Sequence, residues 1–79
     1  MKAKKRICMR LGTDDYHSVE VFAKKRQDAE DEIAAEGGTV SYVTRCTDGR
    51  FKAEGRIPPG TKEETEKLER NGWGWGKQV

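Results

Sequence analysis

Residues 39–57, TVSYVTRCTDGRFKAEGRI, decide the fold that we predict for this chain. Two runs of alternating side chains flank Asp48-Gly49, a pair typical of the two-residue β-turn in which both central residues have positive φ. Such a turn sets Cys46 opposite Phe51 and Thr44 opposite Ala53. The sequence therefore predicts a β-hairpin with one buried and one exposed face.

The predicted register divides the side chains of this hairpin between the two faces. The face that we expect to be buried comprises Val40, Tyr42, Thr44, Cys46, Phe51, Ala53 and Ile57. The face that we expect to be exposed comprises Ser41, Val43, Arg45, Arg50, Lys52, Glu54 and Arg56. A slip of one residue would exchange these faces, because side chains alternate along a strand with a period of two.

The rest of the chain predicts a second hairpin and two helices. Residues 6–11 and 17–23 alternate as half-buried strands, with turn residues between them. Residues 27–36 are rich in Ala and Glu and end at a Gly-Gly pair, and Thr61 begins a capping box for a helix over 61–70. We expect an α+β fold of order β-β-α-β-β-α, a four-stranded antiparallel sheet with two helices on one face.

Composition indicates one small domain over residues 1–79, with 1–5 and 73–79 as its flexible parts. The net charge is only +2, although 38% of the residues are charged. Two cysteines do not make a disulfide framework, and the sequence contains no apolar run typical of a signal peptide or a membrane span. We expect reduced thiols and a cytoplasmic location.

Residues for catalysis are scarce in this sequence. His17 is the only histidine, so no zinc pair can form, and we expect it to be exposed or to cap a turn. No glycine-rich phosphate loop precedes a helix. We therefore expect no enzyme, no cofactor, no metal and no small-molecule substrate.

Charged surface residues are the remaining candidates for a functional site. The exposed sheet face can gather a set of basic residues as a partner-binding site: Arg6, Arg10, Arg45, Arg50, Lys52 and Arg56. The first helix carries a secondary acidic patch of Asp28, Asp31 and Glu32. The basic face is either a solvated surface or a platform for an acidic partner. Nucleic acid is the second choice of partner, because only Phe22 could stack on bases from that face.

The layout resembles that of small phage and prophage proteins. The residues that carry this resemblance are the Ala/Glu helix in RQDAEDEIAAEGG, residues 26–38, and the DGRF hairpin, residues 48–51. Several anti-CRISPR proteins are similar in size, layout and charge, and the resemblance transfers no functional residue. It implies a bacterial host cell and a non-enzymatic inhibitor that binds a host protein or ribonucleoprotein complex, as an anti-CRISPR protein blocks target DNA binding by a Cas effector complex. The alternative is a small nucleic-acid-binding accessory protein that uses the basic sheet face.

Overall fold

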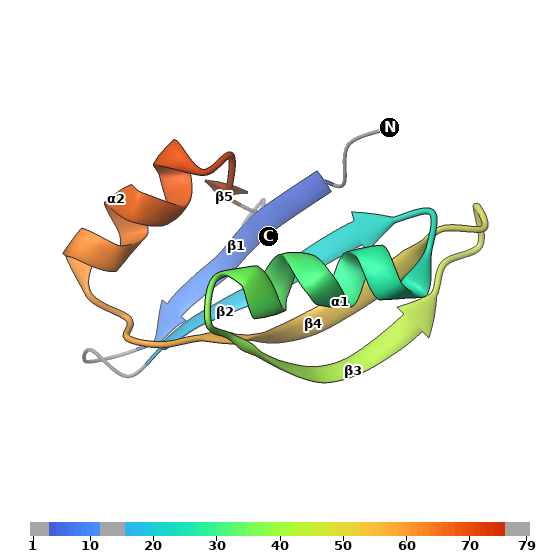
Figure 1. Cartoon of the computed structure of the whole chain (residues 1–79), viewed down its shortest axis with the longest axis horizontal. Coiled ribbons are helices and arrows are strands. Elements are labelled where there is room, and N and C mark those ends of the chain that lie inside the picture. Colours follow the sequence, from blue (N-terminus) through green and yellow to red (C-terminus); the bar gives the residue numbers. More distant parts are fainter. Residues whose placement is uncertain (1–3, 12–15, 76–79) are drawn as a thin grey trace.

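The computed structural model describes residues 4–11 and 16–75, and for residues 9–11 it describes the backbone only. The elements are β1 (Lys4–Leu11), β2 (Tyr16–Ala23), α1 (Arg26–Ala35), β3 (Thr39–Arg45), β4 (Phe51–Ile57), α2 (Lys62–Arg70) and β5 (Gly74–Trp75). The strands form one sheet in the order β3-β4-β2-β1-β5, and the two helices pack on one face of it (Figure 1). The predicted α+β class is confirmed.

The prediction of a four-stranded, purely antiparallel sheet is wrong. Within residues 4–11 and 16–75 the sheet has five strands and is mixed, because β5 runs parallel to β1. Gly72, with φ +96°, turns the chain after α2, and Trp73 then enters the core with 2% of its surface exposed. The buried indole holds Gly74 and Trp75 against β1. A strand of two residues has no periodicity that a sequence pattern could display.

The turn between β3 and β4 also differs from the prediction. The N–H of Cys46 donates to the carbonyl of Arg50 at 2.7 Å, and the N–H of Gly49 donates to the carbonyl of Cys46 at 3.1 Å. These two bonds enclose a three-residue loop instead of a two-residue one. Gly49 has φ +90°, whereas Asp48 does not have positive φ.

This longer turn shifts the register by one residue. Val43 lies opposite Ala53, Thr44 opposite Lys52 and Arg45 opposite Phe51. The faces of β4 are therefore as predicted, but those of β3 are exchanged near the turn. Tyr42 is 53% exposed instead of buried, while Val43 packs against the core. An irregularity between Val40 and Tyr42 then returns Val40 to the core face, as predicted.

The core lies between the sheet and the two helices. Its side chains are Ile7, Val19, Val21, Ala23, Ala29, Ile33, Ala53, Ile57, Leu68 and Trp73. The predicted alternation of β2 and the predicted inner face of α1 are confirmed by this set. In β1 the alternation is interrupted between Ile7 and Met9, so the backbone register sets Arg10 opposite His17.

His17 connects the sheet to α2. The sequence predicts an exposed or capping histidine, but its side chain is fully buried. Nε2 of His17 lies within hydrogen-bond distance of Oγ1 of Thr65, at 2.7 Å, and that hydroxyl donates to the carbonyl of Thr61 at 3.0 Å. The predicted cap is present as well, because Oγ1 of Thr61 accepts from the N–H of Glu64. A buried ring nitrogen with a partner on another element fixes where the first turn of α2 lies.

Replacing Thr65 tests this connection. Thr65→Val keeps the shape of the side chain but leaves His17 Nε2 buried without a partner, so we expect the free energy of unfolding to fall by about 1–3 kcal/mol. Thr65→Ser retains the hydroxyl and should lose less. Urea unfolding followed by circular dichroism measures both variants. A Thr65→Val protein as stable as the wild type would contradict the role given to this hydrogen bond.

Candidate binding surface

The sheet face turned away from both helices, called here the open face, presents a row of side chains across four strands. Arg6 lies opposite Glu20, Glu20 opposite Glu54, and Glu54 opposite Tyr42. The alternation of β2 and β4 places these positions outward, since Val19, Val21 and Ala53 face the core. Two carboxylates therefore stand side by side in the middle of this face.

Each carboxylate in the row has a cation beside it. Arg6 forms an ion pair with Glu20, which is only 9% exposed. Nζ of Lys52 lies 2.9 Å from Oε2 of Glu54. Two of the predicted partner-binding cations are therefore neutralised within the protein, and the open face is not the basic platform that the sequence predicts.

Hydrogen bonding strengthens the second pair. Burial opposes ionisation of Glu54, but hydrogen bonds from Lys52 and Tyr42 outweigh it and lower the pKa of the carboxyl group. The hydrogen bond between Tyr42 and Glu54 raises the pKa of Tyr42, and the hydrogen bond between Lys52 and Glu54 raises the pKa of Lys52. Glu54 is thus held as an anion whose charge Lys52 and Tyr42 already share.

Arginine side chains pack on the aromatic rings of β2. The Cζ atoms of Arg6 and Arg50 each lie 5.3 Å from the ring centroid of Phe22. Cζ of Arg56 lies 4.8 Å from the centroid of Tyr16. These distances are those of cation–π contacts. Phe22 is therefore occupied by two guanidinium groups, which weakens its use as a base-stacking platform.

A tyrosine–arginine cluster of Tyr16, Tyr42 and Arg56 borders two adjoining hollows beside the open face. One, of about 190 Å³, is lined by all three side chains, and the other, of about 380 Å³, by Tyr16, Arg56 and residues of β3. Arg56 comes from the predicted basic set. Sequence reasoning missed the tyrosines, because the predicted register turned Tyr42 inward.

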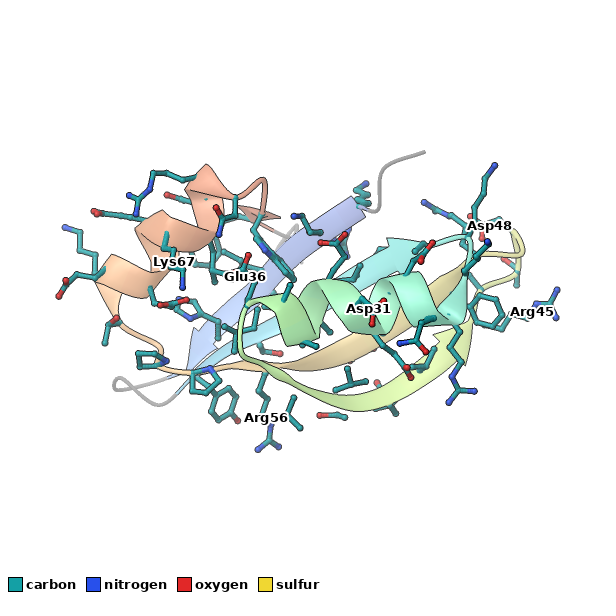
Figure 2. All side chains as sticks on the ribbon, in the orientation of Figure 1. Asp31, Glu36, Arg45, Asp48, Arg56 and Lys67 are labelled. Atoms are coloured by element: carbon teal, nitrogen blue, oxygen red, sulfur yellow. The ribbon has the colours of Figure 1, made fainter. Side chains whose placement is uncertain are left out.

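The six predicted cations are not one patch. Arg45 lies opposite Phe51, with Cζ 5.7 Å from that ring, and so belongs to the helix side of the sheet. Arg50 sits in the turn, where its Nε donates to Asp48 at 2.8 Å. Figure 2 shows Arg45 and Asp48 at the turn end of the sheet and Arg56 well away from them. The prediction that all six share one exposed face is wrong for Arg45, and the side chain of Arg10 lies outside the described residues.

The acidic patch on α1 is likewise divided. Glu32 lies 3.4 Å from Nζ of Lys5 on β1, whereas Oδ1 of Asp31 accepts from Nε2 of Gln27 within the helix. Asp28 is exposed in the first turn. Asp28 and Glu32 border a cavity of about 780 Å³, and Asp31 is not among its lining residues.

That cavity lies where β1 begins, β2 ends, α1 begins and the β3–β4 turn projects. Its cationic lining is Lys5, Lys24, Lys25 and Arg50, and Phe22 and Ala23 supply apolar surface. Nothing in the alternation of the strands indicates this site. The basic run over residues 24–26 could have indicated the site. Residues 24 and 25 form the whole link between β2 and α1, so their side chains must lie at the end of the sheet.

Other kinds of site are absent from the part of the chain that the structure describes. Residues 4–11 and 16–75 contain no cluster of three metal-ligating side chains. None of the helices described there has the length and apolar character needed to cross a membrane. Cys8 and Cys46 are not joined by a disulfide.

Comparison with known proteins gives no relative for this chain: no family model matches it, and neither the curated proteins nor the solved structures contain a similar protein.

Cys8 on the open face allows a chemical test of the carboxylate row. Burial raises the pKa of its thiol to about 11, and the charges of Glu20 and Glu54 add to the effect. The reactive form of a thiol is the thiolate, so at pH 8 we expect folded Cys46→Ser protein to react with a thiol reagent about 100-fold more slowly than in urea.

The pH dependence separates this effect from poor access. The rate in the folded protein should keep rising up to a pH near 11, the pKa that burial gives Cys8. If access alone limited the reaction, the rate would level off near pH 9, the ordinary pKa of a cysteine. Equal rates for folded and unfolded protein would contradict the arrangement of Glu20, Glu54 and Cys8.

Proposed function

We propose that this chain is a non-enzymatic, phage-type inhibitor that binds a host protein or ribonucleoprotein complex, and that a CRISPR effector complex is the target to test first. The resemblance in size and layout to anti-CRISPR proteins suggests the target class. The observation that supports a protein contact is the tyrosine–arginine cluster beside the open face.

The composition of this cluster favours a protein partner. Tyr and Arg are enriched among the residues that dominate protein–protein binding, and they act from hollows that exclude water. Tyr42 is half exposed, and Arg56 is exposed while it packs over Tyr16. A guanidinium that is already ordered against a ring loses little conformational entropy on binding. The partner that fits is a protein subunit with an acidic or carbonyl-rich site for Arg56 beside an apolar contact for Tyr42.

The experiment measures binding to purified effector complexes loaded with guide RNA, together with their binding of target DNA. We expect the wild-type chain to bind one such complex and to reduce its binding of target DNA. Tyr42→Ala with Arg56→Ala should raise Kd on the order of 1,000-fold, because each truncated side chain of this type costs about 2 kcal/mol and the two together cost about 4 kcal/mol.

Asp31→Ala on α1 serves as the control, since Asp31 is exposed on the helix side of the sheet and lines neither of the two hollows (Figure 2). It should bind like the wild type. Melting temperatures establish that each variant is folded. Wild-type protein that binds none of the effector complexes at micromolar concentration would refute the proposed target. Binding that survives the double substitution would refute the proposed surface.

A further inference from the structure

Two neighbouring cations without an acidic partner lie at the end of the sheet, in the link between β2 and α1. Among the described residues, the side chains of Lys24 and Lys25 form no ion pair or hydrogen bond, and both residues are exposed. On the open face, by contrast, Arg6 and Lys52 are both paired. Lys24 and Lys25 both line the 780 Å³ cavity, together with Lys5 and Arg50.

We propose that this cavity binds the sugar–phosphate backbone of a nucleic acid, without reading its sequence. The proposal does not depend on the proposed function, because it concerns a different surface and a ligand that can be tested alone. Lys24 and Lys25 supply unpaired ammonium groups, and Lys5 and Arg50, which pair with Glu32 and Asp48, complete the cationic lining.

The lining favours nucleic acid over an acidic protein. Lysine is depleted in the cores of protein interfaces, which are built on aromatic and aliphatic contacts. This cavity has three lysines and an arginine, and its only apolar side chains are Phe22 and Ala23. Interfaces with nucleic acid are much more positively charged, and lysine binds phosphate as a point charge. Several cations spaced over a wide, open cavity match a chain of phosphates better than a single anion.

Arg50 is held in place for this role. Its Cζ lies 5.3 Å from the Phe22 ring, and Nε donates to Asp48 at 2.8 Å. The backbone N–H of Arg50 also donates to Asp48, and this bond is the main reason that the pKa of Asp48 is lowered. The guanidinium is thereby fixed at the rim of the cavity while its terminal nitrogens remain available to an anion.

Two carboxylates oppose binding at the same place. Asp28 and Glu32 line the cavity, and Glu32 already pairs with Lys5. The carboxylate of Asp28 has no hydrogen bond or ion pair within residues 4–11 and 16–75. Its negative charge should repel a phosphate, so removing that charge should strengthen binding.

The test uses the full chain and a fluorescent 20-nucleotide single strand or 20-base-pair duplex, followed by anisotropy between 50 and 200 mM salt. Lys24→Gln with Lys25→Gln should weaken binding about tenfold or more and lower the slope of log K against log salt by about 1–2, because each lost phosphate contact removes just under one counterion. Lys62→Gln with Lys67→Gln makes the same charge change on α2, outside the cavity, and should stay within about twofold of the wild type.

A variant that binds the oligonucleotide more tightly provides an independent test, because a misfolded protein would lose affinity and not gain it. Asp28→Asn should tighten binding about two- to fivefold, whereas Asp31→Asn, which makes the same change outside the cavity, should not. Polyglutamate serves as a competitor to distinguish a polyphosphate site from a site for any acidic chain, and the single strand and duplex distinguish the two forms of nucleic acid.

Three results would overturn the proposal: no binding of either oligonucleotide at 50 mM salt, equal losses in the two lysine pairs, or displacement of the oligonucleotide by polyglutamate at equal charge. None of them bears on binding to an effector complex through the tyrosine–arginine cluster. Conversely, oligonucleotide binding that responds only to Lys24, Lys25 and Asp28 would support the proposal even if no effector complex is bound.

Discussion

The hydrogen bond from the N–H of Cys46 to the carbonyl of Arg50 closes the turn on which the arrangement of the open face depends. With three residues inside that bond, Val43 faces the core and Tyr42 faces outward. Arg45 is removed to the helix side by the same shift. A two-residue turn would have buried Tyr42 and placed Arg45 beside Lys52 on the open face. The choice of turn therefore determines both the aromatic contact surface and the distribution of charge.

Charge is separated along the molecule by strand pairing. Glu20 on β2 and Glu54 on β4 meet because the two strands pair in register, and each brings a cation with it. Near the start of α1, Glu32 pairs with Lys5, whereas Asp28 lines the same cavity as Lys24 and Lys25 without forming an ion pair with either. The two carboxylates of the open face are therefore each paired with a cation, whereas the ammonium groups of Lys24 and Lys25 at the sheet end are not paired.

Local patterns were sufficient for much of this fold. The alternation of Val19 and Val21, the spacing of Ala29 and Ile33, and the cap at Thr61 depend on neighbours within a few residues, and each was predicted correctly. The turn between β3 and β4 was predicted incorrectly, because Asp-Gly suits both a two-residue loop and a three-residue loop with Gly49 at positive φ. Competing packing of Val43 and Tyr42 decides between them, and that is a tertiary effect. The burial of His17 and the short strand β5 also depend on contacts between distant segments.

The candidate sites were predictable only in part, for the same reason. Arg56 was named from the sequence, but its contact with Tyr16 joins the start of β2 to the end of β4.

The most direct test of this fold is the pairing of β3 with β4, measured by cross-strand nuclear Overhauser effects on labelled protein. We expect contacts between the backbones of Val43 and Ala53 and of Thr44 and Lys52. Contacts between Thr44 and Ala53 instead would show the two-residue turn, and would contradict both the exposure of Tyr42 and the proposed surface.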